Sequence, residues 1–194
     1  MRAVWGSSPD DVWAVGAYGT VVHWDGVEWK KVATPLTLSL NDIWGTSSSD
    51  IYILKTSIDN TSTVAHYDGK QWRDLSDLFL SEQRNLNSFW IDRSGTGYAV
   101  GNTTYRYNGA LFERIYINQL SYSMRVRGYN SSNVFITGQM SRVYHYNGID
   151  WTRYYELENN TATFSEIRGI QVFENKVFLV GKTNRAIIYM GDLK

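Results

Sequence analysis

The chain has 194 residues, with Lys plus Arg equal to Asp plus Glu at 19 each, so its net charge is zero. Nucleic-acid-binding proteins usually show a basic excess or a basic stripe, and this sequence has neither. Cys is absent, which excludes disulfides, thiolate nucleophiles and Cys-based metal sites. No apolar run approaches the roughly 20 residues that span a bilayer, so membrane insertion is not expected.

The first thirty residues predict four short strands joined by turns. Each run is rich in strand-forming residues and is bounded by turn residues: "VWG" at 4–6, "VWAVG" at 12–16, "VVHW" at 21–24 and "EWKKV" at 28–32. Asp25-Gly26 stands between the third and fourth runs. Because Asp-Gly favours the type I′ turns of β-hairpins, we expect these two strands to form a hairpin through such a turn.

The same unit recurs along the chain. The hairpin "HWDGVEW" at 23–29 has the copies "HYDGKQW" at 66–72, "RYNGALF" at 106–112, "HYNGIDW" at 145–151 and, in part, "IYMGDLK" at 188–194. The turn glycines of the five copies are spaced by about 40 residues: Gly26, Gly69, Gly109, Gly148 and Gly191.

Both faces of these strands carry apolar or aromatic groups, so each sheet needs cover on both sides, and the sequence offers no helices to provide it. Four antiparallel strands repeated at about 40 residues are typical of a β-propeller, in which each sheet covers the next. We therefore predict an all-β propeller forming one domain over 1–194. Its five repeats are expected at 3–32, 42–75, 88–115, 125–155 and 166–194.

The arrangement "VWG-SSPDDVWAVG-GTVVHWDG-W" resembles the propeller repeats of bacterial surface and secreted proteins, of the Asp-box (BNR-like) and kelch-like type. The resemblance covers nearly the whole chain. It implies a propeller fold and an extracellular or cell-surface location.

The three His residues, His23, His66 and His145, are candidates for a metal site. All three occupy one repeat position, just before the aromatic and the turn. Equivalent positions in different blades lie far apart, so we expect a packing role and no metal.

Catalytic motifs are not convincing. "VGKT" at 180–183 ends like a phosphate-binding loop, but position 176 is Lys where that motif needs Gly. Acidic residues occur in turns between strands (Asp10, Asp11 and Asp50) and in the repeat turns (Asp25 and Asp68), where an Asp side chain bonds its own backbone. We therefore expect no catalytic centre and no cofactor. The alternative is a glycosidase-like enzyme with paired carboxylates in the axial channel.

One column of residues stands out as a candidate ligand site. The centre of the first strand of each repeat reads Trp5, Trp44, Trp90, Arg127 and Arg168. The first strand is innermost in a propeller. If the column lines the axial channel, three aromatic rings and two guanidinium groups can stack on a sugar and hold an anionic group. The alternative is that the Trp rings pack between blades.

Loops on one face are the other candidate surface. The links between repeats are long and varied, at 33–41, 76–87, 116–124 and 156–166, and the loops between second and third strands add Tyr18, Asn60, Asn102 and Asn184. Loops on a rigid scaffold commonly carry binding. We predict non-catalytic binding of a glycan or a protein partner, with exposed aromatic platforms indicating a glycan and a larger apolar patch indicating a protein.

Two further expectations concern packing and closure. The aromatics three residues after the turn glycines should be buried between blades: Trp29, Trp72, Phe112 and Trp151. In the fifth repeat the chain stops at this position, so that repeat lacks its fourth strand. Its free edge, "AIIYM" at 186–190, is apolar and invites self-association. Either the five blades close into a ring or they belong to a larger one, and we predict the closed ring.

Overall fold

The computed structural model of the chain describes residues 1–80, 85–120, 122–158, 166–182 and 186–193. Their strands form five antiparallel sheets, in each of which the strand order follows the sequence. Blade one has β1 (Ala3–Ser8), β2 (Asp11–Val15), β3 (Val21–Trp24) and β4 (Trp29–Lys31); blade two has β5 (Ser39–Ser47), β6 (Asp50–Thr56), β7 (Ser62–Tyr67) and β8 (Trp72–Asp74).

Blade three has β9 (Leu86–Ile91), β10 (Gly97–Gly101), β11 (Thr104–Tyr107) and β12 (Phe112–Ile115). Blade four has β13 (Ser123–Asn130), β14 (Asn133–Gly138), β15 (Val143–Tyr146) and β16 (Trp151–Arg153). Blade five has three strands, β17 (Glu166–Val172), β18 (Lys176–Lys182) and β19 (Ala186–Asp192). Three single-turn 3₁₀ helices complete the described elements, η1 (Ala17–Gly19), η2 (Ser76–Leu78) and η3 (Tyr155–Leu157). The predicted all-β propeller with five repeats and a three-stranded last blade is confirmed.

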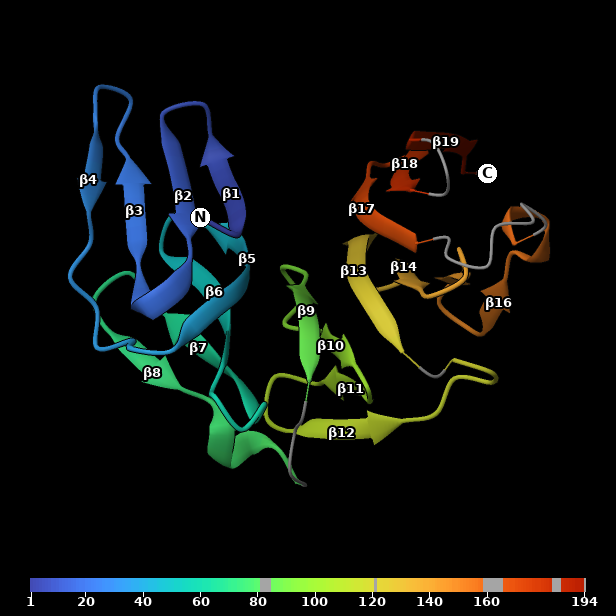
Figure 1. Cartoon of the computed structure of the whole chain (residues 1–194), viewed down its shortest axis with the longest axis horizontal. Helices are drawn as coiled ribbons and strands as arrows, with labels where there is room; N and C mark the ends of the chain where they lie inside the picture. Colours follow the sequence, from blue (N-terminus) through green and yellow to red (C-terminus); the bar gives the residue numbers. More distant parts are fainter. Residues whose placement is uncertain (81–84, 121, 159–165, 183–185, 194) are drawn as a thin grey trace.

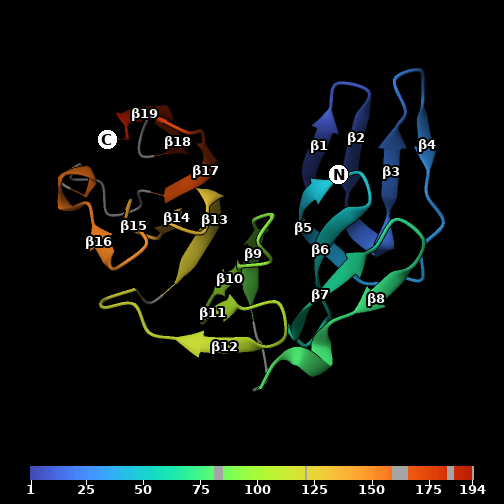
Figure 2. The same cartoon turned by 180° about the vertical axis from the view of Figure 1, so that it is seen from behind.

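The blades follow one another along an arc (Figures 1 and 2). The innermost strands pack in succession, β1 on β5, β5 on β9, β9 on β13 and β13 on β17. Among the described residues, no strand of blade one has an extensive contact with blade five, and the two end sheets stand apart in both views. The predicted closed ring is therefore wrong. The curvature is set by one repeated interface, and four such interfaces do not turn the chain through a full circle.

The core lies between blades, as the two-sided apolar strands require. Between blades one and two, Trp13, Val15 and Val21 pack against Ile43 and Ile51 in one cluster. Each central blade buries both of its faces in this way. Among the described residues, the two end blades each have one face that no other blade covers.

The predicted interblade aromatics follow this pattern. Phe112 is fully buried, and Trp72 and Trp151 are partly buried against the core clusters. Trp29, by contrast, is 51% exposed. The prediction is confirmed for three positions and is wrong for Trp29, because among the described residues no other blade packs against its side of blade one.

The hairpins between third and fourth strands lie where the glycines predicted them in the first four blades. In blade one, the Asp25 carboxylate accepts hydrogen bonds from the backbone N–H groups of Val27 and Glu28, both at 3.0 Å. Gly26 has a φ of 91°, whereas Asp25 does not have a positive φ. The expected type I′ turn is therefore wrong, because the loop has four residues and the Asp side chain satisfies its N–H groups.

The fifth copy departs from the repeat. Gly191 lies inside β19, opposite Val177, and not at a turn. The residue before each turn glycine is Asp or Asn in the first four copies, but it is Met190 here. Without a side-chain acceptor to hold the turn, the strand continues, so assigning Gly191 as a turn glycine was wrong.

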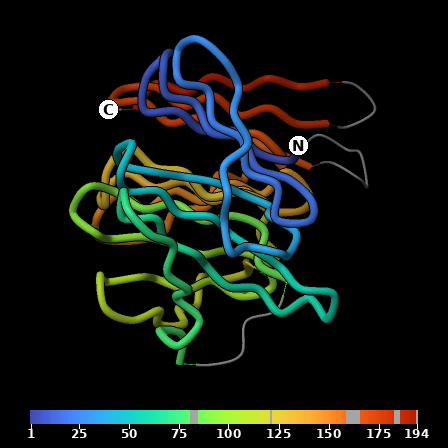
Figure 3. Tube along the Cα trace, turned by 90° about the vertical axis from the view of Figure 1, so that its left-hand side faces the viewer, coloured from blue at the N-terminus to red at the C-terminus, as the bar shows by residue number. Residues whose placement is uncertain are grey.

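The strands run between two faces of the arc, where the connections gather (Figure 3). We call the face with the turns between first and second strands the turn face; the turns between third and fourth strands also lie there. The opposite face carries the loops between second and third strands and the links between blades, and we call it the link face. These two faces hold the candidate binding surfaces.

Candidate binding surfaces

A groove of about 860 Å³ lies at the turn face and is lined by residues from the inner strands of blades one to four. The column residues Trp5, Trp44 and Trp90 all line it. A methyl group on Gly45 would meet the Trp5 ring at 2.7 Å, and one on Gly128 would meet the Trp90 ring at the same distance. The Trp of one blade thus packs on the Gly of the next, and this contact requires a residue without a side chain.

The remaining Trp of the column is held by other contacts. The Trp44 indole N–H donates to the carbonyl oxygen of Ile91 at 2.9 Å. The Arg127 guanidinium lies over the ring, 4.9 Å from its centroid. Trp44 is therefore anchored to blade three along its edge and covered by a cation from blade four.

Arg127 itself is bound to a buried carboxylate in blade two. Its two terminal nitrogens donate to the Asp42 oxygens at 2.8 and 3.1 Å. Asp42 is buried and also accepts from the Ser88 hydroxyl at 2.6 Å and from the Phe89 N–H at 3.1 Å. Burial by itself raises the pKa of the Asp42 carboxyl, but the Arg127 charge and these hydrogen bonds outweigh it and hold the pKa below its usual value.

The last residue of the column lies apart from this arrangement. Arg168 is exposed and donates through Nε to the Glu166 carboxylate at 2.6 Å. It is not among the residues that line the groove. The structure thus brings together Trp5, Trp44, Trp90 and Arg127 but not Arg168, and a ligand-binding role for the column stays a prediction.

The Asp42 pKa predicts a measurable pH dependence. Because the folded pKa is depressed, the stabilisation by Asp42 is complete above the ordinary Asp pKa of about 3.9 and is lost as the pH falls through the folded value. The difference in free energy of unfolding between the wild-type chain and Asp42→Asn should therefore shrink as the pH is lowered from about 5 to about 2. Urea unfolding across this range measures it, and a constant difference would contradict the pairing.

The three His residues share one structural role, as their common repeat position suggested. Their rings stack on the aromatic of the second strand, with centroid separations of 4.3, 4.3 and 4.2 Å for Trp13–His23, Tyr52–His66 and Phe135–His145. Each Nε2 is hydrogen-bonded to the first residue of that strand, at 2.6 Å to Asp11, 2.7 Å to Asp50 and 2.9 Å to Asn133. Burial lowers the pKa of His145. In the described part of the chain, no three metal-binding side chains of the His, Cys, Asp or Glu type converge.

A second groove, of about 430 Å³, lies at the link face between blades one and two. Its rim carries two large exposed side chains, Tyr18, which is 91% exposed, and Ile58, which is fully exposed. Arg2, Asn41 and other polar residues line the rest of it. Tyr18 and Ile58 are the two most exposed large apolar side chains among the described residues, and both line this groove.

The backbone on the link face is unusual as well. Six residues other than glycine have positive φ in the described ranges, and all lie in link-face loops: Tyr18, Asn60, Asn85, Gln119, Met140 and Ser141. Such conformations cost about 1–3 kcal/mol each and cluster where a loop has a function. Tyr18 and Asn60, at φ of 54° and 67°, both line the groove.

The loop that carries Tyr18 is held tightly in place. Gly19 has a φ of 66°, and a methyl group on it would lie 1.7 Å from the Leu36 carbonyl oxygen. Its N–H donates to the Leu38 carbonyl at 2.8 Å. Only glycine fits this position, so the exposed Tyr18 ring is presented from a fixed backbone.

The groove floor is polar. The Asn41 amide donates to the Thr56 hydroxyl at 3.0 Å, and the Arg2 guanidinium donates to the Asn41 side-chain oxygen. The half-buried Asn41 and Thr56 and the exposed Arg2 can pair with the backbone of an extended peptide through their remaining hydrogen-bonding capacity, while Tyr18 and Ile58 can contact an apolar side chain.

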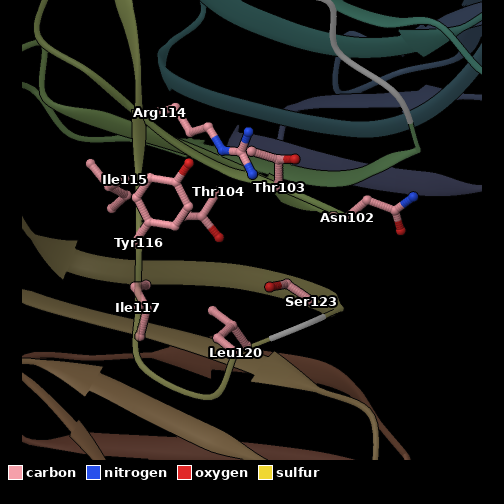
Figure 4. Close-up of a pocket in the computed structure, with 10 residues that line it drawn as sticks. Asn102, Thr103, Thr104, Arg114, Ile115, Tyr116, Ile117, Leu120 and Ser123 are labelled. Carbon is pink, nitrogen blue, oxygen red and sulfur yellow. The ribbon is translucent and has the colours of Figure 1, made fainter.

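Another link-face pocket lies where blade three leads to blade four (Figure 4). Arg114 and Tyr116 lie beside it, with the guanidinium 4.8 Å from the ring centroid. Its volume is about 60 Å³, far below the roughly 300–1,000 Å³ of ligand sites. The groove between blades one and two is therefore the better candidate.

Two residues of this groove, Tyr18 and Asn60, were predicted as part of a binding surface from their loop positions. Asn102 lines the smaller pocket near blade four, and Asn184 lies outside the described residues. Ile58 was not among the predicted residues. The signal that could have found it was a large aliphatic residue inside a polar loop, "SIDNTS" at 57–62, where no strand pattern calls for one.

Comparison with known proteins identifies the fold class. No family model matches the chain, and no curated protein matches it. Solved structures do match. A structure described as YCF48 bound to D1 peptide has a TM-score of 0.55 and 13% identity, and the match covers 99% of this chain and 76% of that one. The WD40 β-propeller domain of Doa1 has a TM-score of 0.69 and 13% identity, and the match covers 100% of this chain and 64% of that one. U3-55K also matches (TM-score 0.70, 8% identity, 92% of this chain and 57% of that one). These matches show that the chain has a β-propeller fold, and it spans less than two thirds of the Doa1 and U3-55K chains.

The described part of the chain contains no helix with the length and apolar character needed to cross a membrane.

Proposed function

We propose that this propeller is a non-catalytic protein-binding module and that the link-face groove between blades one and two holds an extended peptide segment of its partner. The observation that carries the proposal is the pair of exposed apolar side chains, Tyr18 and Ile58, on the rim of a 430 Å³ groove. Two exposed apolar side chains from neighbouring loops on one groove are typical of a protein contact, because leaving them in water costs free energy that a partner's side chain recovers.

The groove favours a particular kind of segment. An apolar side chain can sit between Tyr18 and Ile58, and an extended backbone can pair with the polar floor around Asn41 and Thr56. Arg2 supplies a positive charge at the same groove, which favours a carboxylate near the apolar anchor. The expected motif is therefore an apolar residue with an acidic residue nearby.

The fold comparison supports the general role. One matched structure is described as bound to a peptide, which shows that a propeller of similar fold holds such a ligand. A glycosidase-like role has less support. Asp92 is the carboxylate among the residues that line the turn-face groove, and its Oδ1 accepts hydrogen bonds from the backbone N–H groups of Ser94 and Thr96 at 2.8 and 3.1 Å.

Substitution of the rim should weaken peptide binding. Linear peptides selected from a phage-displayed random library on the whole chain should lose at least about tenfold in affinity, or 1.4 kcal/mol, on Tyr18→Ala or Ile58→Ala. The matched control is Ile149→Ala, because Ile149 is similarly exposed but lies in a turn-face hairpin. Isothermal titration calorimetry gives the Kd of each variant.

Two results would contradict the proposal: failure to select any peptide, or selected peptides whose Kd is the same for Tyr18→Ala and the wild-type chain. A glycan array on the same preparation tests the carbohydrate alternative. Glycan binding that survives Tyr18→Ala would favour the turn-face groove with its Trp column instead.

A further inference from the structure

The small link-face pocket between blades three and four is lined largely by polar side chains (Figure 4). Six of its ten lining residues have a side chain that can donate a hydrogen bond, namely Asn102, Thr103, Thr104, Arg114, Tyr116 and Ser123. Among the residues that the structure describes, none of these six side chains has a hydrogen-bond partner. All of these donors are therefore available to one ligand.

Two of the donors are buried hydroxyl groups. The Ser123 side chain is 1% exposed, and its Oγ has no partner in the described part of the chain. Thr104 is 6% exposed and lines the same pocket. Most buried polar side-chain atoms in proteins are paired, because leaving one unpaired costs its full desolvation penalty. Two unpaired hydroxyl groups in one pocket therefore point to a polar ligand.

The charge of the pocket favours an anion. Arg114 is its one charged lining residue, and the guanidinium is oriented by the Tyr116 ring, whose centroid lies 4.8 Å away. Glu113 precedes Arg114 in β12, so its side chain points to the opposite face of the strand. In Figure 4, Arg114 and Thr103 lie on one side of the pocket and Ser123 lies on the other. A guanidinium and several neutral donors around one space suit the oxygens of an anion.

The size of the pocket restricts which anion can enter. Its volume is about 60 Å³. One water molecule takes up about 30 Å³ of the liquid, so the pocket has the space of two waters. A phosphate or sulfate group, which has four oxygens around one central atom, is of this size. A sugar ring or a whole amino acid is too large.

The two loops that form the pocket are held in place by other contacts. A methyl group on Gly101 would lie 2.0 Å from the Asn85 carbonyl oxygen, which also accepts the Asn102 N–H at 3.2 Å. In the link between the blades, the Gln119 carbonyl accepts from the Arg142 guanidinium at 3.2 Å. Binding therefore orders little additional backbone, which favours affinity for a small ligand.

We propose that this pocket binds a single phosphate or sulfate group, with Arg114 supplying the positive charge and Thr104 and Ser123 the buried hydroxyl donors. The group is either a free ion or the terminal group of a small ester, since both present the same oxygens. The pocket lies between blades three and four, whereas the Tyr18 groove lies between blades one and two. The two proposals therefore stand independently.

Titration with inorganic phosphate at constant ionic strength, followed by NMR of the backbone amides, tests the site. The signals of Thr103, Thr104 and Ser123 should shift and saturate, with a Kd of about 1 mM or lower. Arg114→Gln should weaken binding by at least about tenfold, because it removes the charge-assisted hydrogen bonds. Arg93→Gln is the matched control and should leave the Kd unchanged, since Arg93 is an exposed arginine of blade three that lines the turn-face groove.

Ser123→Ala separates binding from packing. It removes a hydroxyl that has no partner among the described residues, so the free energy of unfolding should not fall. The Kd for phosphate should nevertheless rise by at least about fivefold. Wild-type affinity in Arg114→Gln or Ser123→Ala, an equal loss in Arg93→Gln, or signals that shift without saturating would overturn the proposal.

Two further ligands identify the source of the group. Sulfate should compete with phosphate, because its size and oxygen geometry are the same, and a failure to compete would contradict the proposed pocket. O-phosphoserine that binds more tightly than inorganic phosphate would support a terminal phosphate of a larger molecule. O-phosphoserine that binds equally or more weakly would support the free ion.

Discussion

Arg127→Ala should lower the free energy of unfolding by about 3–5 kcal/mol, the usual cost of leaving a buried charge without its partner. Arg127 donates two hydrogen bonds to Asp42, which is buried and relies on this guanidinium for its ion pair. The substitution also removes the cation above Trp44 and the donor to the Ser88 hydroxyl at 2.9 Å. Urea unfolding at neutral pH measures the loss.

Arg168→Ala is the matched control, since it removes the Arg at the same repeat position in blade five. Arg168 is exposed and pairs with Glu166 at the surface, so its loss should change stability by no more than about 1 kcal/mol. Equal effects of the two substitutions would show that the bond between Arg127 and Asp42 does not contribute as its burial implies.

Phe112→Ala should cost about 3–5 kcal/mol of folding free energy, because it opens a cavity in the interface between blades two and three. The Phe112 ring is 0% exposed and stacks on Phe79 and Tyr107, with centroid separations of 3.8 and 4.5 Å. It also belongs to the cluster that contains Tyr52 and Leu54 of blade two. Thermal or denaturant unfolding gives the difference.

Trp29→Ala provides the control at the equivalent position of blade one. Trp29 packs loosely on Trp24, at a centroid separation of 6.0 Å, and half of its surface is in water. Its truncation should cost less than about 1.5 kcal/mol despite the larger side chain. If Trp29→Ala and Phe112→Ala lowered the free energy of unfolding equally, another part of the protein or another molecule would have to cover Trp29 in solution.

The repeat made the fold predictable from the sequence. Turn residues and aromatics recur at fixed offsets, and each copy repeats the same strand-forming runs, so a consistent local pattern pointed to one architecture. Side chains that deviate from the repeat were harder to interpret. Met190 stands where the other copies have Asp or Asn, so the fifth copy lacks the side-chain acceptor of the turn, and a continuous strand lies where a turn at Gly191 was predicted.

The candidate sites were less predictable because they depend on distances between blades. The column of Trp and Arg was visible in the sequence, but the partner of Arg127 was not, since Asp42 lies 85 positions away in another blade. Likewise, the curvature that keeps blade five from blade one follows from the geometry of the blade interface. The angle between neighbouring blades cannot be predicted from any pattern of residues in the sequence.

The bond between Arg127 and Asp42 bears on how the molecule unfolds. In an array of stacked units, each unit ordinarily interacts only with its immediate neighbours, so a unit can open once its two interfaces break. This bond joins blade four to blade two and passes over β9 of blade three, where Ser88 and the Phe89 backbone also bind it. It therefore couples next-nearest neighbours and makes the three central blades one cooperative unit, while the end blades retain the freedom to fray independently.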